Sequence, residues 1–250
     1  GALASLPEVN EIHVQPASSD NGVALGAALL SSINHGKRPK NIMPHVYFGP
    51  SFNDHEIELA LKEAKVSYKK PKNLCKTIAK NIFEGKIVGW FQGRSEVGAR
   101  ALGARSILAN PLMVNMREKL NAEVKHREPW RPFCPSLTAE AYPIYFGDAK
   151  LSEHMILAFP VVEKYRDLIP AAVHVDGTAR PQAVNKNINP IFHKLLAEFG
   201  DLSGHPLLIN TSFNIQGEPI VNAPRDALRC FGGTGIDVLA IGSFVVEKNL

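Results

Sequence analysis

The stretch from Gly93 to Pro135 constrains this chain most, because it places an excess of positive charge among glycines and apolar residues. It holds eight of the 28 lysines and arginines but only four of the 24 acids, so the rest of the chain is neutral and the surplus equals the net charge of +4. These bases are Arg94, Arg100, Arg105, Arg117, Lys119, Lys125, Arg127 and Arg131. Guanidinium groups and an ammonium that converge in a fold make a site for a polyanion. A solvated charged face is the alternative, and the alternation of these bases with Gly, Ala, Leu and Pro disfavours it.

The length and composition limit the possible number of domains and the possible cellular compartment. A chain of 250 residues with 45% hydrophobic and 21% charged residues is typical of a globular protein with one large domain or one and a half ordinary ones. Its three cysteines are far apart and odd in number, which favours a reducing compartment over disulfides or zinc. We find no apolar run of ~18 residues and no signal peptide, so a cytoplasmic protein without a membrane segment is expected.

Strand-like and helix-like segments alternate, which predicts an α/β fold with a mixed, twisted sheet. The expected helices are Asp54–Ala64, Leu74–Phe83, Asn115–Glu123, Pro190–Phe199 and Pro224–Phe231. The expected strands are Ser67–Tyr68, Ile87–Gln92, Ser106–Ala109, the first part of Ala171–Arg180, Pro206–Ile209, Val238–Ile241 and Phe244–Glu247. The aromatic segment Tyr142–Leu157 is expected to be irregular, as a flap would be.

The first fifty residues have a different character. The chain opens without Met on a strand-like segment, Glu11–Gln15, as if cut from something longer, and a small-residue helix is expected at Val23–Ile33. Asp20 lies in the turn between them. On the residues alone, a helix cap is favoured for Asp20 over a phosphate or metal ligand. The Pro- and Gly-punctuated segment from Lys37 to Pro50 reads as a linker.

Four groups of polar residues could converge on one ligand. They are Arg94/Arg100/Arg105, Lys125/Arg127/Arg131, His174/Asp176/Arg180 and Ser212/Asn214. Lys125 and Arg127 of the second group are expected on one side of an extended segment, because strand side chains alternate with a period of two. We find no GxSxG, no Walker GxxxxGK[ST] and no metal-ligand spacing in the sequence. Many cations and few nucleophiles indicate transfer between phosphorylated species, in which positioning and charge neutralisation dominate.

Four motifs follow one another along the chain: GRSEVGARALGARSILANP, VKHREPWRPFCPS, IPAAVHVDGTARPQAV and LLINTSFNIQGEPIV. Together, and in this order, they resemble the NodU/CmcH-type O-carbamoyltransferases from roughly Pro44 to the C-terminus. The earlier run VQPASSDNGVALGAAL resembles the end of that family's N-terminal domain, which has a sugar-kinase/actin-like fold. The family's C-terminal domain is similar to YrdC-like proteins, whose K-x-R and S-x-N pairs match residues 125–127 and 212–214.

The resemblance implies a division of the chain and a two-step reaction. Residues 1–36 would be the end of the kinase/actin-like domain, 37–50 the linker and 51–250 a YrdC-like domain with a twisted mixed sheet and flanking helices. The YrdC-like domain would form carbamoyl adenylate from carbamoyl phosphate and ATP with Mg²⁺. The kinase-like domain would then pass the carbamoyl group to an acceptor hydroxyl compound. Since much of that second domain is not in these 250 residues, we expect the first half-reaction at most.

The resemblance also implies roles for individual residues. Arg100, Arg105, Lys125 and Arg131 resemble ligands of phosphate and carbamoyl phosphate, with Lys125, Arg105 and Arg131 in the catalytic roles. Nucleotide and carbamoyl-adenylate ligands are implied at Arg180, Ser212 and Asn214. Asp20 would be one ligand of an incomplete divalent-metal site, which overturns the preference for a cap. Arg94, Arg127 and His174 complete the candidate binding set on the charge pattern alone.

A nucleic-acid module is the main competing hypothesis, because YrdC-like folds have a concave basic surface suited to double-stranded RNA. The positive charge is local, however, and no long basic stripe or aromatic-glycine RNA motif is present. Nucleic acid is therefore a disfavoured partner. The sequence leaves open the acceptor compound and the oligomeric state, with a homodimer as one possibility.

Overall fold

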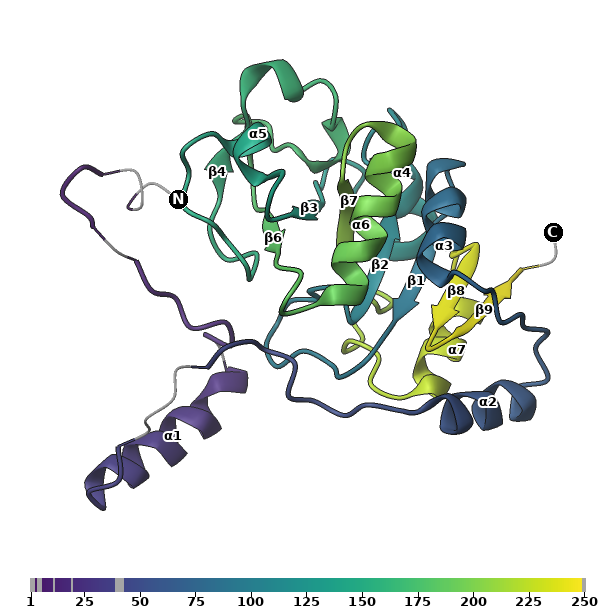
Figure 1. The fold of residues 1–250 in the computed structure, drawn as a ribbon, viewed down its shortest axis with the longest axis horizontal. Helices are drawn as coiled ribbons and strands as arrows, with labels where there is room; N and C mark the ends of the chain where they lie inside the picture. The colour runs from purple at the N-terminus through teal and green to yellow at the C-terminus, as the bar shows by residue number, and fades with distance from the viewer. Residues whose placement is uncertain (1–2, 4–5, 11, 19, 39–42, 249–250) are drawn as a thin grey trace.

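A seven-stranded mixed sheet is the centre of the structure, a computed structural model that describes residues 3, 6–10, 12–18, 20–38 and 43–248 (Figure 1). The strand order is β6-β3-β7-β2-β1-β8-β9, in which β1 pairs with β8 and β3 with β6 in parallel and the remaining pairs are antiparallel. The strands are β1 (Val88–Phe91), β2 (Arg105–Ala109), β3 (Cys134–Thr138), β6 (Gln182–Val184), β7 (Leu207–Ser212), β8 (Val238–Ile241) and β9 (Phe244–Glu247). The expected α/β class with a mixed sheet is confirmed.

Helices cover both faces of this sheet. On one face, α3 (Leu74–Phe83) and α6 (Pro190–Ser203) lie side by side and bury a cluster centred on Ile78, Phe192 and Trp90 (Figure 1). The other face is covered by α2 (Asp54–Glu63), α4 (Met116–Leu120) and α7 (Pro224–Gly232). Because both faces are covered, β1, β2 and β8 are buried along their whole length; β1 and β8 accordingly read as continuous apolar runs, whereas β2 begins with Arg105 and Ser106.

Local capping signals set where the helices begin. The Asn53 side chain accepts a hydrogen bond from the N–H of Glu56, and the N–H of Asn53 donates to the Glu56 carboxylate; this capping box starts α2. The Asn73 side chain caps α3 and the Asn189 side chain caps α6, where Pro190 takes the first helical position. The expected helices at these places are confirmed, to within a few residues at their ends.

Three other expectations were wrong in detail. Residues 67–68 form no strand, and the segment touches the sheet only by a bridge between Lys69 and Val245. In the 171–180 segment the strand is confined to β5 (Thr178–Ala179), paired with β4 (Phe159–Pro160), while η4 (Pro170–Ala172) is a 3-10 turn. The irregular segment 142–157 begins with a short helix, α5 (Tyr142–Phe146), whose aromatic rings are buried in a satellite core rather than in a flap.

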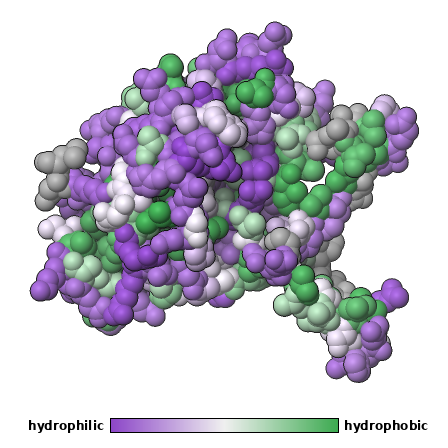
Figure 2. All heavy atoms as spheres, turned by 180° about the vertical axis from the view of Figure 1, so that it is seen from behind, coloured by the Kyte–Doolittle hydropathy of each residue, from purple (hydrophilic) through white to green (hydrophobic). Residues whose placement is uncertain are grey.

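The N-terminal part is tied to the rest much more loosely. Helix α1 (Asp20–Asn34) has no buried residue, and Figure 1 shows it projecting from the body. Figure 2 shows hydrophobic residues on its surface, of which Val23 and Leu30 are more than half exposed. Residues 12–15 form no strand, so that expectation was wrong where it can be compared; Glu11, Ser19 and 39–42 lie outside the described residues.

The end of the expected linker belongs to the folded body. Val46 is buried and accepts a backbone hydrogen bond from Val97, and the Tyr47 hydroxyl donates to the carbonyl of Leu102 at 2.8 Å. This segment therefore lies against the loop that carries the first arginines of the basic stretch. Throughout the described ranges, no helix combines the length and the apolar character needed to span a bilayer.

Candidate functional site

A small pocket of about 140 Å³ collects three of the predicted cations and Ser212 of the S-x-N motif, while Asn214 lies outside its lining. It lies between the loop that precedes β2, the start of β3 and the carboxyl end of β7. Ligands of open α/β sheets are usually bound outside the carboxyl ends of strands, so the position is a common one for a binding site. The lining residues include Arg100, Arg127, Phe133, Cys134, Arg180, Asn210 and Ser212.

The three arginines of this pocket lack an acidic partner among the described residues. Burial lowers the pKa of Arg100, and the nearby charge of Arg180 lowers it further. The pKa of Arg127 is also lowered, by burial first and then by Arg131. Arg100 is exposed at one side, while Arg127 and Arg180 are half-buried, and like charges held together in such a partly enclosed pocket are unfavourable unless an anion joins them. The electrostatics therefore describe an anion site.

Two of the guanidinium groups are oriented by side chains that the sequence patterns did not single out. Arg127 donates from Nε to Asn121 Oδ1 at 2.6 Å and lies over the ring of Phe133, 4.7 Å from its centre. Arg180 donates from Nη2 to the sulfur of Cys134 at 3.1 Å, while its Nε is buried without an acceptor in the described structure. The arginines are therefore held in place, yet retain unused donors for a ligand.

Lys125 of the K-x-R motif contacts both polar residues of the S-x-N motif. Its ammonium donates to the carbonyl of Ser212 at 2.6 Å, to Ser212 Oγ at 3.2 Å and to Asn214 Oδ1 at 2.8 Å. Burial lowers the pKa of Lys125 to about 7, and the charge of Arg127 acts in the same direction. An ammonium this enclosed can change its charge near neutral pH, which a surface lysine cannot do.

The backbone around Lys125 differs from the expectation. The 115–123 helix is α4 followed by the π-helical turn η2 (Asn121–Lys125), and His126 has a left-handed φ of 46°. The extended segment expected at 125–127 was therefore wrong. The tight turn sends Lys125 toward the end of β7 and Arg127 into the pocket, and π-helical turns are frequent at functional sites.

Glu96 holds the loop that carries Arg100. Its Oε1 accepts from the backbone N–H groups of Leu102 at 2.6 Å, Ala104 at 2.8 Å and Arg105 at 3.3 Å. Burial raises the pKa of Glu96, and these N–H donors oppose that effect. The carboxylate thus closes the loop on itself with Arg100 near its middle.

Arg105, which the sequence placed among the catalytic residues, lies apart from the pocket lining. It is fully buried, and its guanidinium donates to the carbonyls of Gln92 and Ala104 at 3.0 Å, of Pro50 at 3.1 Å and of Gly93 at 3.2 Å. The group stacks on Phe91 with 3.6 Å between the guanidinium carbon and the ring centre. These contacts give Arg105 a structural task, and its catalytic role stays a prediction.

The other candidates also lie outside the pocket lining. Arg94 is exposed and donates to the carbonyl of Phe48, and Arg131 pairs with Glu128 at 3.5 Å on the surface. His174 contacts Thr178 Oγ1 at 2.9 Å, and the Asp176 carboxylate accepts from the same hydroxyl at 2.7 Å. Burial lowers the pKa of His174, and Arg180 adds to this.

Asp20 begins α1, where it is exposed. Among the described residues no group of three His, Cys, Asp or Glu side chains could hold a metal ion. Any further ligands of the proposed divalent-metal site would therefore come from outside the described part, and the assignment of Asp20 stays a prediction.

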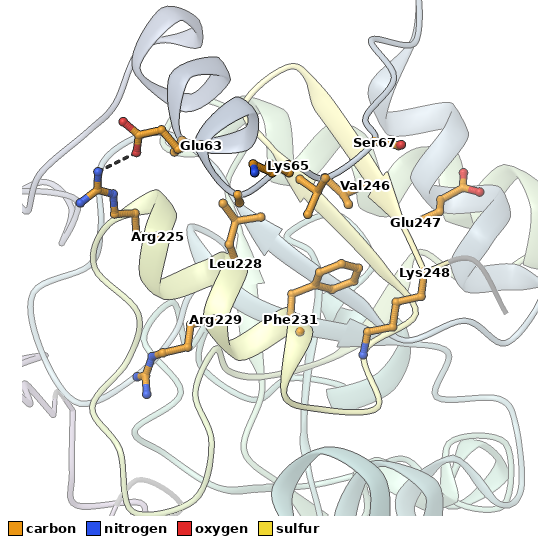
Figure 3. A pocket seen from close by; sticks show the side chains of 14 residues that line it. Glu63, Lys65, Ser67, Arg225, Leu228, Arg229, Phe231, Val246, Glu247 and Lys248 are labelled. Atoms are coloured by element: carbon orange, nitrogen blue, oxygen red, sulfur yellow. Dashed lines mark hydrogen bonds and ion pairs between the residues drawn. The ribbon is translucent and has the colours of Figure 1, made fainter.

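A larger pocket of about 810 Å³ lies elsewhere, between α2, α7 and β9 (Figure 3). Its two arginines already have partners: Arg225 pairs with Glu63 at 2.6 Å and Arg229 with Glu218 at 2.8 Å. Because this charge is offset within the protein, the smaller pocket with its unpaired arginines is the stronger candidate for an anion.

Four residues that shape the site were not among the predicted candidates: Asn121, Cys134, Glu96 and Asn210. Asn210 alone carried a usable signal, because it opens the polar run that ends an apolar strand. Glu96 and Asn121 act through loop contacts with residues six to ten positions further along the chain, which no motif marks. Cys134 acts through a contact with Arg180, 46 positions away.

Comparison with known families agrees with this geometry. The family model of the carbamoyltransferase C-terminus matches residues 79–248, which include every residue of the pocket. The chain therefore belongs to the carbamoyltransferase family.

Three relatives illustrate the match. Nodulation protein NolNO of Sinorhizobium fredii is 40% identical over 96% of this chain and 36% of its own length. Nodulation protein NolO of Bradyrhizobium diazoefficiens is 39% identical over 96% of this chain and 45% of its own length. Nodulation protein U of Rhizobium fredii is 33% identical over 93% of this chain and 38% of its own length. The chain thus spans less than half the length of these relatives.

Two solved structures share part of the arrangement. Full-length HypF in a phosphate- and nucleotide-bound form has a TM-score of 0.49 and 20% identity, covering 70% of this chain and 22% of its own. A Sua5 from P. abyssi has a TM-score of 0.47 and 17% identity, covering 67% of this chain and 45% of its own.

Proposed function

We propose that this chain is the carbamoyl-activating part of an O-carbamoyltransferase, which binds carbamoyl phosphate and ATP and forms carbamoyl adenylate. The observation that carries the proposal is the pocket in which Arg100, Arg127 and Arg180 meet without an acidic partner in the described structure. Membership of the carbamoyltransferase family supports the choice of anion.

In the proposed reaction, carbamoyl phosphate, ATP and water give carbamoyl adenylate, phosphate and pyrophosphate. The C–O–P linkage of carbamoyl phosphate is cleaved by water, and the resulting carbamate oxygen attacks the α-phosphorus of ATP and expels pyrophosphate. Both substrates are polyanions, so their charges must be offset before they can approach. The arginines of the pocket would bind the phosphate oxygens, and Mg²⁺ would neutralise part of the charge of ATP.

Lys125 is suited to the boundary between the two substrates. Its ammonium already contacts Ser212 and Asn214, which we propose as nucleotide-facing groups, and Arg127 two residues later lines the pocket. Transfer to an acceptor hydroxyl would require the remainder of the longer relatives, since the chain spans less than half of their length.

The test is calorimetric titration of the protein with carbamoyl phosphate, beside an assay of ATP/pyrophosphate exchange that carbamoyl phosphate should stimulate. A charge-assisted contact contributes about 1.5–3 kcal/mol, so Arg180→Met should weaken binding by about tenfold to a hundredfold. Lys62→Ala is the control, because Lys62 is exposed on α2 and paired only with Glu58. Equal affinities of the two variants for carbamoyl phosphate would contradict the proposal.

The nucleic-acid alternative makes a different prediction. Binding of double-stranded RNA should fall steeply as salt is added, because counterions are released from the phosphate backbone. A gel-shift titration across salt concentrations would detect it, whereas a pocket of about 140 Å³ should prefer carbamoyl phosphate over inorganic phosphate at every ionic strength.

A further inference from the structure

Asn210 contributes an unusual polar group to the wall of the pocket. It lies on β7 with 1% of its surface exposed and lines the pocket beside Arg180. Its Oδ1 is buried and has no hydrogen-bond donor among the described residues. Buried polar atoms are nearly always paired, so an unpaired one beside a pocket calls for a partner that the protein itself does not supply.

The orientation of this amide is fixed by its other end. Asn210 Nδ2 lies 2.9 Å from Ser136 Oγ, 3.2 Å from the carbonyl of Ala101 and 3.2 Å from Gln182 Oε1. The carbonyl of Ala101 can only accept, so rotating the amide by 180° would bring two acceptor oxygens together. Oδ1 is therefore held as the free acceptor.

The neighbouring amide is fixed as well, which secures that arrangement. Gln182 Nε2 donates to the carbonyl of Leu102 at 2.9 Å, and its Oε1 accepts from Ser136 Oγ at 2.7 Å. The oxygen of Gln182 therefore faces Asn210 and cannot exchange with the nitrogen without losing both bonds. A connected polar network of this kind holds each member in one orientation.

The pocket wall also has an unpaired donor. Arg180 Nε is buried without an acceptor in the described part of the chain, just as Asn210 Oδ1 lacks a donor. A ligand that satisfies both must offer an acceptor oxygen and a hydrogen-bond donor within one small molecule. The monohydrogen form of inorganic phosphate has a P–OH and an ionised acyl phosphate has no donor, whereas a carbamoyl group carries a permanent –NH₂ donor beside its carbonyl.

We propose that Asn210 Oδ1 accepts a hydrogen bond from the –NH₂ of the bound carbamoyl group, which makes Asn210 the residue that selects a carbamoyl over an acyl phosphate. This inference rests on the proposed function, because it assumes that the pocket binds the carbamoyl phosphate. It adds the source of selectivity: the arginines attract the phosphate of any such compound, and Asn210 distinguishes –NH₂ from a methyl group of similar size.

Two stable phosphonates allow a direct test. Phosphonoacetamide and acetonylphosphonate differ only in having –NH₂ or –CH₃ on the carbonyl, and both can be titrated calorimetrically. The wild-type protein should bind the amide about tenfold or more tightly than the ketone, since a site built around an N–H rejects an analogue that lacks it. In Asn210→Ala this ratio should fall to about 1–2, mainly through weaker binding of the amide.

Two further variants separate the possible results. Ser136→Ala removes one contact of Asn210 Nδ2 and the hydrogen bond from Ser136 Oγ to Gln182 Oε1. Asn210 Nδ2 keeps its contacts with the carbonyl of Ala101 and with Gln182 Oε1, so Oδ1 should keep its orientation and the variant the wild-type ratio. Arg180→Met should weaken both phosphonates by similar factors and leave the ratio unchanged. If the wild-type protein binds both compounds equally, or if Asn210→Ala keeps the full ratio, the selectivity assigned to Asn210 is wrong while the anion site stands.

The wild-type ratio still tests the proposal if Asn210→Ala does not fold, because Asn210 carries the only unpaired buried side-chain acceptor among the described residues of this pocket. Failure of the wild-type protein to bind either phosphonate or carbamoyl phosphate would instead overturn the proposed function, and the selectivity of Asn210 with it.

Discussion

Two arginine environments from one motif, GARALGAR, are built in opposite ways. Arg105 is fully buried, and four backbone carbonyls and the ring of Phe91 surround its guanidinium. Arg100 enters a pocket where its nearest charged neighbour, Arg180, carries the same sign. The comparison teaches that a buried cation marks a ligand site only where the protein has not already supplied its acceptors.

The largest difference should appear in stability. Replacing Arg105 by Met removes one hydrogen-bond donor from carbonyls of three separate segments and its stacking on Phe91, so we expect a loss of about 3 kcal/mol in the free energy of unfolding. Urea denaturation measures it. Arg94→Met is the matched control, since Arg94 is exposed and makes one such bond, and its loss should be about 0.5 kcal/mol. Similar unfolding midpoints for the two variants would show that the carbonyl cage contributes little.

Glu96 connects the two environments, and its removal should affect both. In Glu96→Ala three buried N–H groups lose their acceptor, from which we expect about 2 kcal/mol of destabilisation together with weaker phosphate binding through Arg100. In Glu96→Gln the amide oxygen can replace the acceptor, so most of the stability should return. Unfolding curves and phosphate titrations on both variants check this, and a stability loss as large in Gln as in Ala would favour charge over hydrogen bonding as the cause.

Loss of a pocket arginine should change the free energy of unfolding in the opposite direction from loss of Arg105. Without a ligand, Arg180→Met relieves repulsion of Arg100 and should raise the free energy of unfolding by up to about 1 kcal/mol. The same variant should lose the stabilisation that phosphate gives to the wild-type protein. Thermal unfolding with and without phosphate measures both effects. If Arg180→Met is less stable than the wild-type protein without phosphate, Arg180 has a structural role like that of Arg105.

The smallest effect is a change in proton binding. Because burial lowers the pKa of Lys125 to about 7 in the folded protein, from an ordinary value of 10.5, the unfolded chain binds more protons between these values, and the contribution of Lys125 to stability rises with pH across that window. An anion in the pocket raises the pKa of Lys125, so phosphate binding at pH 8 should take up as much as about one proton. Calorimetry in buffers of different ionisation enthalpy measures this uptake, and Lys125→Met should abolish it.

Much of the fold could be predicted from local signals. The starts of three helices are indicated by their capping residues, because a capping side chain acts within four residues; these are Asn53, Asn73 and Asn189. The apolar runs of β1 and β8 indicate buried strands, because this signal too lies within a few consecutive residues. The strand order could not be predicted in this way, because the insertion of β7 between β3 and β2 depends on pairing between distant segments.

The site was predictable in type but not in geometry. The charge pattern indicated an anion site, and Arg100, Arg127, Arg180 and Ser212 do line one pocket. The separate environment of Arg105 could not be foreseen, because its carbonyl partners converge only in the folded chain. The course of residues 125–127 was missed since a period of two cannot anticipate a π-helical turn followed by a left-handed residue.

The position of β7 has a consequence for how this protein is made. Its partners β2 and β3 leave the ribosome first, yet the strand that lies between them in the sheet is synthesised roughly seventy residues after β3. Until then the nascent chain exposes two unpaired strand edges, which can attract neighbouring chains. Lys125 precedes its partner Ser212 by 87 residues, so this contact also forms late. Ligand capture by a growing chain should therefore begin abruptly, once β7 has emerged from the exit tunnel and closed the gap.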